Sequence, residues 1–216
     1  MRYCILIIGF ICEINNISYG QIIRELLFDE FTLSANRTFF SGNNTEGKYG
    51  FGLGAYNSFR SDKKLNVLVG FEYNQSNFFV NYSYDGHYAY YYDLSYKLNS
   101  ISIPLGLRYN LGPKQSFFFE SGVFVDLVIN SSRKGTHVYY YDPQVISESE
   151  IDETDVLSNS LGSYFGIGIL IPISKYKFIV KSDYKCGFNK WYTNSLDDEE
   201  VIHNNCVNIR IGLKIN

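Results

Sequence analysis

The sequence lacks any apolar run long enough to form a membrane-spanning helix, which needs about 20 residues. After Gln21 it also lacks sustained helical periodicity, except for a short stretch over residues 22–28. The first absence excludes a helical membrane anchor, and the second disfavours a helical domain. What remains is an all-β chain, either soluble or embedded in a membrane through strands.

Lysine and arginine are not clustered. The formal net charge is −3, and no run of cations is interleaved with aromatic residues. Because nucleic-acid recognition depends on such a basic surface, no nucleic-acid partner is expected.

Cysteine is scarce, and only Cys186 and Cys206 lie beyond residue 20. They flank the last long polar segment, so a disulfide across it is one hypothesis for an oxidising compartment. Strand alternation, however, places Cys186 outward and Cys206 inward, and thiols on opposite faces cannot be bridged without a local irregularity. Two free thiols are the favoured interpretation.

The first 20 residues have the features of an export signal. Arg2 supplies a short positive segment, an apolar segment runs from Cys4 to Cys12, and Ser18-Tyr19-Gly20 forms a small-x-small cleavage site. We therefore expect residues 1–20 to be a signal peptide and residues 21–216 to form one domain.

The clearest pattern is at the end of the chain, over Val207–Ile215. Every odd position is aliphatic and every even position is polar, cationic or glycine, which is period-two alternation. A soluble core cannot easily accommodate the face that carries Arg210 and Lys214. A strand with one face toward lipid and the other toward a polar lumen is typical of a transmembrane β-barrel.

Seven further segments alternate in the same way, in a chain with 20 tyrosines and 17 phenylalanines, residues that favour strands and wet interfaces. The eight predicted strands are 26–36, 48–59, 65–74, 98–110, 116–130, 161–172, 176–188 and 207–215. In the second strand Gly50, Gly52 and Gly54 share the inward face, where they leave room for larger side chains opposite.

The links between these segments alternate in length. Short links fall at residues 60–64, 111–115 and 173–175, and long links at 37–47, 75–97, 131–160 and 189–205. Tight periplasmic turns and long extracellular loops are typical of outer-membrane barrels. The sequence therefore predicts an all-β fold: an eight-stranded antiparallel up-and-down transmembrane β-barrel in the outer membrane of a Gram-negative-type cell, in contact with its lipid.

The predicted inward faces carry nine charged residues that we expect to form a structural network in the lumen. They are Glu72, Arg108, Glu120, Asp126, Lys181, Asp183, Lys185, Arg210 and Lys214. An eight-stranded barrel is about wide enough for side chains to fill, and buried charges must be paired to avoid a large desolvation cost. The sequence thus favours a salt-bridged plug over a conducting pore.

Two pairings can be predicted from register. A turn centred near Lys114 sets Arg108 opposite Glu120, and a second register sets Asp183 opposite Arg210 while keeping both inside.

No constellation of residues points to catalysis, a cofactor or a metal. The three histidines, His87, His137 and His203, fall in long links, and Asp85 beside His87 is an incomplete match to a hydrolase or acyltransferase site. No spacing suits metal ligands. We therefore expect no enzyme, no cofactor and no metal site.

The long links differ in composition. The last two hold ten acidic residues, which we interpret as solubilising. The second long link is different, because its residues 78–96 are dense in tyrosine. Asp85-Gly86 indicates a hairpin tip there, so this segment is expected to extend the third and fourth strands beyond the membrane. These links are the candidate contacts for an extracellular or envelope protein partner.

Four segments in order, SIPLGLRY at 102–109, FFFESGV at 117–123, Gly166-Ile167-Gly168 and NIRIGLK at 208–214, resemble the PorT-like outer-membrane β-barrel family typical of Bacteroidota. The resemblance implies an eight-stranded outer-membrane barrel and no catalytic residues. Such chains commonly finish on an aromatic residue, whereas this one ends Ile215-Asn216.

A structural or interactive barrel is thus the main functional hypothesis. Two alternatives stay open: a secreted lipocalin-like ligand binder, which would need an apolar cavity and a tryptophan near the first strand, and a subunit of a protein-export complex. The only tryptophan, Trp191, lies in a long link.

Overall fold

The computed structural model describes residues 28–39, 45–59, 64–84, 88–112, 116–141, 144–154, 159–193 and 201–215. The predicted signal peptide lies outside these residues. Within them, no helix is long and apolar enough to cross a bilayer.

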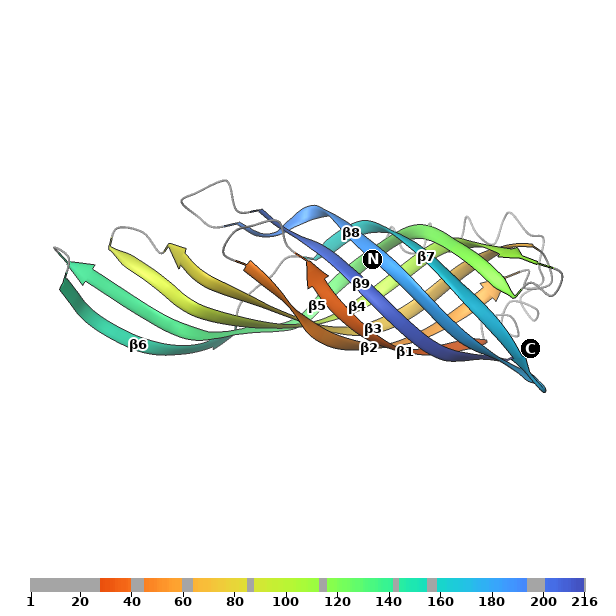
Figure 1. Cartoon of the computed structure of the whole chain (residues 1–216). Helices are drawn as coiled ribbons and strands as arrows, with labels where there is room; N and C mark the ends of the chain where they lie inside the picture. Colours follow the sequence, from red (N-terminus) through yellow and green to blue (C-terminus); the bar gives the residue numbers. More distant parts are fainter. Residues whose placement is uncertain are drawn as a thin grey trace.

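Nine β-strands make up the described fold (Figure 1). They are β1 (Glu30–Phe39), β2 (Thr45–Phe59), β3 (Leu65–Tyr84), β4 (Ala89–Leu111), β5 (Phe117–Tyr141), β6 (Gln144–Thr154), β7 (Ser160–Ile173), β8 (Tyr176–Thr193) and β9 (Val201–Ile215).

Eight of the strands close into an antiparallel barrel. Around the wall, β1 pairs with β2, β2 with β3, β3 with β4 and β4 with β5. The wall then continues from β5 to β7, from β7 to β8 and from β8 to β9. Closure comes from β9 pairing with β1 over ten residues, from Glu30 opposite Lys214 to Phe39 opposite Asn205. The predicted eight-stranded barrel is therefore confirmed, including its closure between the first and last strands.

The strand ends at the predicted periplasmic side fall within one residue of their predicted positions from the second strand onward. The β7–β8 turn and the C-terminal end of β9 lie at this same end of the barrel (Figure 1). In the β4–β5 link, Gly112 has φ +85°, a left-handed conformation that favours glycine.

The predicted bounds of the first strand were wrong. It begins at Glu30 rather than residue 26 and runs to Phe39 rather than Asn36; residues 26 and 27 lie outside the described part. Its alternation was read correctly, because Phe31 and Leu33 are exposed while Thr32 and Ser34 are buried.

All eight barrel strands alternate in this way, with aliphatic and aromatic residues on the outer wall. On β9, Ile209, Ile211, Leu213 and Ile215 are each about half exposed, at 60%, 48%, 50% and 47%, while Arg210 is 1% exposed. An apolar exterior around a polar interior is the reverse of a soluble protein and matches a lipid-facing wall.

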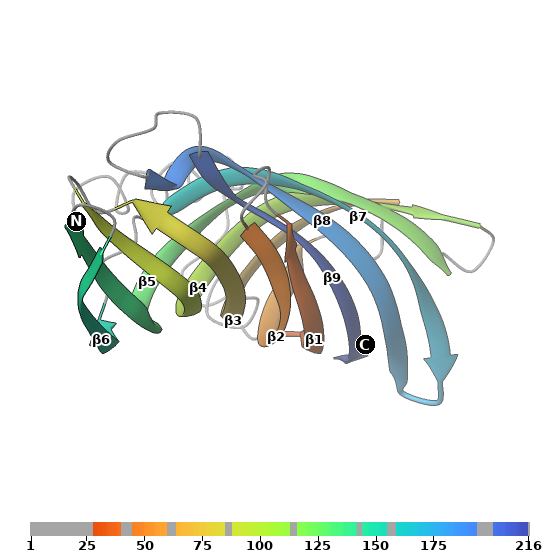
Figure 2. The same cartoon turned by 60° about the vertical axis from the view of Figure 1, so that its left-hand side comes forward.

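The long links at 75–97 and 131–160 proved to be largely strand. Beyond the barrel, β3, β4 and β5 continue side by side, and β6 adds to β5 as a fourth strand (Figures 1 and 2). The extension of the third and fourth strands over residues 78–96 is thus confirmed; its tip at residues 85–87 lies outside the described residues. The prediction of a loop over 131–160 was wrong, because strand pairing outside lipid does not require an apolar outer face.

Candidate functional site: the charged barrel interior

Among the described residues, ten charged side chains in the barrel interior are each at most 5% exposed. Nine are the residues named from the sequence, and the tenth is Glu30. They are Glu30, Glu72, Arg108, Glu120, Asp126, Lys181, Asp183, Lys185, Arg210 and Lys214. Five carboxylates therefore face five cations, so the interior can be neutral without an added ion.

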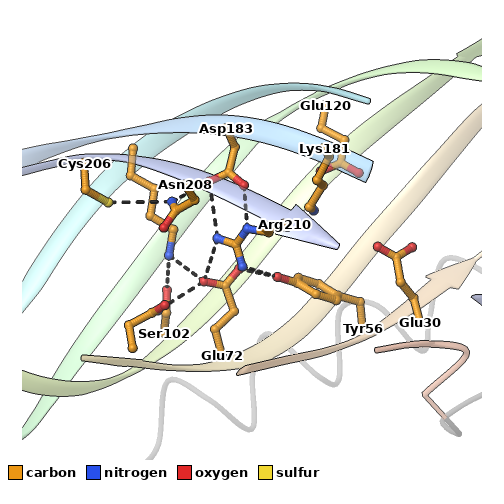
Figure 3. A network of polar contacts seen from close by, with 12 residues as sticks. Glu30, Tyr56, Glu72, Ser102, Glu120, Lys181, Asp183, Cys206, Asn208 and Arg210 are labelled. Carbon is orange, nitrogen blue, oxygen red and sulfur yellow. Dashed lines mark hydrogen bonds and ion pairs between the residues drawn. The ribbon is translucent and has the colours of Figure 1, made fainter. Parts of the chain in front are cut away.

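Arg210 is the centre of the network (Figure 3). Its Nε donates to Asp183 Oδ1 at 2.5 Å, and its Nη1 donates to Tyr56 Oη at 2.7 Å and lies 3.0 Å from Glu72 Oε1. The Tyr56 hydroxyl donates in turn to Glu72 Oε1 at 2.6 Å. Four strands, β2, β3, β8 and β9, are thus tied together across the lumen.

A second group surrounds Arg108. The guanidinium donates to both oxygens of Glu30 at 2.7 and 2.9 Å and, through Nε, to Glu120 at 2.6 Å. Lys181 Nζ donates to the other oxygen of Glu120 at 2.9 Å. Because Arg108 also lies 4.4 Å from the centroid of the Phe118 ring, its charge is held by two carboxylates and one aromatic face.

Lys185 joins the network from the extracellular side. Its Nζ donates to Glu72 Oε2 at 2.7 Å and to Ser102 Oγ at 2.9 Å, and lies 4.0 Å from Asp126 Oδ1. Glu72 therefore contacts both Arg210 and Lys185, so its two oxygens bridge two cations.

Lys214 forms a separate group near the periplasmic end of the barrel. Its Nζ contacts Ser58 Oγ and lies 2.9 Å from Asp29 Oδ2, and Ser58 Oγ donates to the same carboxylate at 2.6 Å. Each lumen cation thus contacts at least one carboxylate.

Apolar and small polar side chains bracket the charges. Along β3 the inward series passes from Glu72 through Asn74 and Ser76 to Phe78 and Val80, and the last two pack with Leu94, Tyr96 and Leu98 of β4. At the periplasmic end Phe118, Leu170 and Ile179 form a second buried cluster. The charges therefore lie between one apolar cluster at the periplasmic end and another where β3 and β4 begin to project from the barrel. This polar interior does not support the lipocalin-like alternative, which needs an apolar ligand cavity.

A cavity beside Lys185 is small. Its volume is about 10 Å³, and its lining includes Asn36, Asn74, Lys185 and Asn208. A volume of this size holds about one water molecule.

The family model for the outer membrane protein beta-barrel domain matches residues 24–192. The chain belongs to this family. Membership, together with the apolar outer wall, places the protein in the outer membrane of a Gram-negative-type cell.

Several solved structures match this chain. Neisserial surface protein A is 11% identical, with 86% of this chain and 95% of that chain covered and a TM-score of 0.42. Ail of Yersinia pestis, in complex with the heparin analogue sucrose octasulfate, is 11% identical, with coverages of 86% and 94% and a TM-score of 0.39. CarO of Acinetobacter baumannii is 8% identical, with coverages of 88% and 99% and a TM-score of 0.38. No curated protein matches at a significant level.

One predicted register is correct and the other is wrong. Arg108 lies opposite Glu120, but Asp183 lies opposite Asn208, and Arg210 lies opposite Lys181. Lys190 pairs with His203, a register that would set Asp183 opposite Arg210 if it continued regularly, but an irregularity between Cys186 and Lys190 shifts it by two residues. Arg210 still reaches Asp183 diagonally.

The two cysteines follow the predicted parity. Cys206 is buried beside the network, where its Sγ accepts from Asn208 Nδ2 at 3.6 Å, and Cys186 is half-buried. Both thiols are free.

Glu30 and Tyr56 belong to the network, yet the sequence reasoning did not name them. Both continue an alternation that had been recognised, since Glu30 precedes Thr32 and Ser34, and Tyr56 follows Gly50, Gly52 and Gly54. Extending each inward series by one step would have found them.

Glycines in the wall make space for large interior side chains. A Cβ on Gly106 would overlap the Tyr164 hydroxyl and lie 2.9 Å from the Ser121 carbonyl oxygen. The close approach of β4 to Tyr164 therefore depends on this glycine.

We expect Gly106→Ala to lower the free energy of unfolding by about 1–3 kcal/mol, as overpacking does. Adding Tyr164→Phe should restore part of the loss, because it removes the overlapping hydroxyl. Gly166→Ala is the comparison and should lose less stability, since its Cβ would make a tight contact of 3.1 Å with Asp183 Cβ but would not overlap it. Denaturant unfolding in liposomes is measured for the wild type, Gly106→Ala, Tyr164→Phe, the double variant and Gly166→Ala, and strict additivity of the Gly106 and Tyr164 changes would contradict the proposed contact.

Proposed function

We propose that the protein is a closed, non-catalytic membrane anchor that presents a β-sheet outside the membrane for contact with an extracellular or envelope protein. The observation that carries this proposal is the contrast between the two parts of the molecule. The lumen contains paired charges and an apolar cluster at its periplasmic end, while four strands project beyond it.

The projecting sheet supports an interactive role through its outer edge. Within the described residues, β6 pairs with β5 alone. An unpaired strand edge presents backbone donors and acceptors that can pair with a strand of another chain. Glu148, Glu150 and Asp152 on β6 are exposed, which discourages pairing between two copies of the chain and favours a partner with cationic side chains.

The order and spacing of SIPLGLRY, FFFESGV and NIRIGLK support a narrower proposal, that the chain is of the PorT-like type. A role as a subunit of an envelope export complex is the alternative for such a chain.

The closed lumen can be tested by electrical recording. The purified protein, folded in a planar phosphatidylcholine bilayer, is expected to show no stepwise conductance, because each lumen cation contacts a carboxylate and the neighbouring cavity holds about one water molecule. A general porin in the same bilayer is the positive control. Regular conductance steps that disappear when the protein is heat-unfolded would overturn the proposal.

The interactive role needs a different measurement. A photo-crosslinking residue placed at Glu150 on the free edge of β6 should give one defined adduct in the native membrane, while the same residue at the lipid-facing Leu33 should give none of that adduct. An adduct that also forms from positions near the periplasmic turns, such as Lys175, would instead favour the export-complex alternative. Absence of a protein adduct from β6 would remove the interactive role and leave the anchor.

A further inference from the structure

Three cations lie on the outer wall of the barrel near its extracellular end. They are Arg37 of β1, Lys48 of β2 and Lys97 of β4, and all three are exposed. Lys48 and Lys97 both lie opposite Asn77 of β3, one on each side. Directly opposed residues of an antiparallel sheet point to the same face, so these lysines share the outward face with Asn77.

The three side chains form one row. Adjacent strands are about 4.8 Å apart, so the backbones of Lys48 and Lys97 are separated by roughly 10 Å, with Asn77 between them. Arg37 lies opposite Tyr49, the residue next to Lys48. Along the same row on the other side of Arg37, the outward residues Val207 and Tyr184 carry no positive charge. Among the described residues of this row, the positive charge therefore lies on β1, β2 and β4.

Aromatic rings hold two of these cations. The Arg37 guanidinium carbon is 5.7 Å from the centroid of the Phe39 ring and 5.3 Å from that of Tyr49, and Lys48 Nζ is 5.4 Å from that of Phe79. Cation–π contacts of this kind orient the charged ends without neutralising them.

The row lies at the outer boundary of the apolar wall. On β2 the outward face runs from Phe59 to Tyr49. These eleven residues of a tilted strand span about 25 Å of membrane depth, the height of the lipid-facing band of such barrels. The cations therefore lie at the level of the lipid headgroups in the outer leaflet.

One carboxylate already approaches this row. Glu46 Oε2 is 2.8 Å from Lys48 Nζ, and both side chains are exposed, at 60% and 47%. Hydrogen bonding and attraction from Lys48, with a smaller effect of Arg37, hold the pKa of Glu46 below its usual range. With Glu46 counted, the row keeps two uncompensated positive charges, and a second anion can compete with an exposed ion pair of this type.

We propose that Arg37, Lys48 and Lys97 bind the phosphate groups of anionic lipid in the outer leaflet, with Phe39, Tyr49 and Phe79 packed against the same lipid. Guanidinium and ammonium groups form charge-assisted hydrogen bonds with phosphate, and the height of the row matches the headgroup layer. The site would hold an ordered lipid on one side of the barrel. It is independent of any protein partner of β6.

The test uses the full mature protein in phosphatidylcholine nanodiscs that contain a small fraction of bisphosphorylated lipid A. Native mass spectrometry then measures how much lipid A is retained per barrel. Arg37→Gln with Lys97→Gln should reduce retention roughly tenfold, as expected for the loss of charge-assisted bonds. Glu46→Gln should increase retention, because it frees Lys48 from its internal carboxylate.

Lys175→Gln is the matched control, since Lys175 is an exposed cation in the β7–β8 turn at the opposite end of the barrel. It should leave retention unchanged. Single substitutions replace the double variant if heat-modifiable gel migration shows that the latter is unfolded. Dephosphorylated lipid A should be retained no better by the wild type than by the double variant, and inorganic phosphate should not compete unless the site takes free phosphate instead of lipid.

Three outcomes would overturn the proposal: equal losses for Lys175→Gln and the double variant, retention that does not depend on the lipid A phosphates, or a decrease with Glu46→Gln. Efficient competition by inorganic phosphate would replace the lipid with a soluble anion as the ligand.

Discussion

Replacing Arg210 by glutamine is expected to lower the free energy of unfolding by about 3–5 kcal/mol, the range for breaking a buried ion pair from one side. Arg210 is 1% exposed and contacts Asp183, Glu72 and Tyr56. Glutamine keeps a hydrogen-bonding group but leaves the two carboxylates short of one positive charge. The barrel should still insert, because its lipid-facing wall is unchanged.

The measurement is urea unfolding in phosphatidylcholine liposomes, with the folded fraction read from heat-modifiable gel migration. Lys134→Gln is the control, because Lys134 and Asp152 form an ion pair whose side chains are 66% and 67% exposed, and such pairs contribute at most about 1 kcal/mol. Adding Asp183→Asn to Arg210→Gln should recover part of the stability, because it removes an unpaired charge. If the Arg210 and Lys134 variants lose similar stability, Arg210 does not occupy a buried network.

Replacing Ile211 by arginine, one residue further along β9, is expected to impair a different property. Ile211 is 48% exposed on the outer wall, midway between Val207 and Ile215, and a charge at the bilayer midplane costs about 2–4 kcal/mol. The variant should insert poorly and be depleted from the outer-membrane fraction.

Ile215→Arg serves as the matched control. It introduces the same side chain near the periplasmic end of the same strand, where the cost falls to about 0–1 kcal/mol. Normal membrane fractionation of Ile211→Arg, or equal defects in the Ile211→Arg and Arg210→Gln variants, would mean that the two faces of β9 are assigned incorrectly.

The barrel could be predicted because lipid imposes a strict pattern on each strand. Over Val207–Ile215 of β9, an aliphatic residue at every outward position and a polar residue or glycine at every inward position leave a single orientation for the strand. The short β4–β5 link fixes register as well, which is why Arg108 and Glu120 could be paired from their distances to Lys114.

Register across a long link could not be predicted in the same way. Between β8 and β9, the irregularity near Cys186 shifts the pairing by two residues, and nothing in the alternation of either strand marks that shift. The contact between Arg210 and Asp183 could still be anticipated, since both residues remain on the inward face and an arginine side chain reaches a diagonal neighbour.

Strand β6 was missed for a different reason. Its central residues Ser147, Glu148, Ser149 and Glu150 are all exposed, so no run of alternating apolar residues reveals a strand. It forms because β5 continues past the membrane and offers an unpaired edge, and that template is visible only in the folded chain.

The functional proposal follows from the same division of the molecule. Within the membrane, the inward-facing side chains contact one another through ion pairs and packing. Beyond the membrane, the edge of β6 has backbone groups available for a strand of another protein. At the membrane boundary, the cations of the outer wall are available for a lipid phosphate.

The most direct test of this account is a nuclear magnetic resonance measurement of contacts between side-chain methyl groups and lipid acyl chains in nanodiscs. A lipid-embedded barrel should give strong cross-peaks from the methyl groups of Ile211 and Leu213 to the acyl chains, and none from Leu68 and Ile179, which are 2% and 0% exposed inside the barrel. Acyl-chain contacts for Leu68 and Ile179, or water contacts for Ile211, would contradict a lipid-embedded barrel with a filled interior.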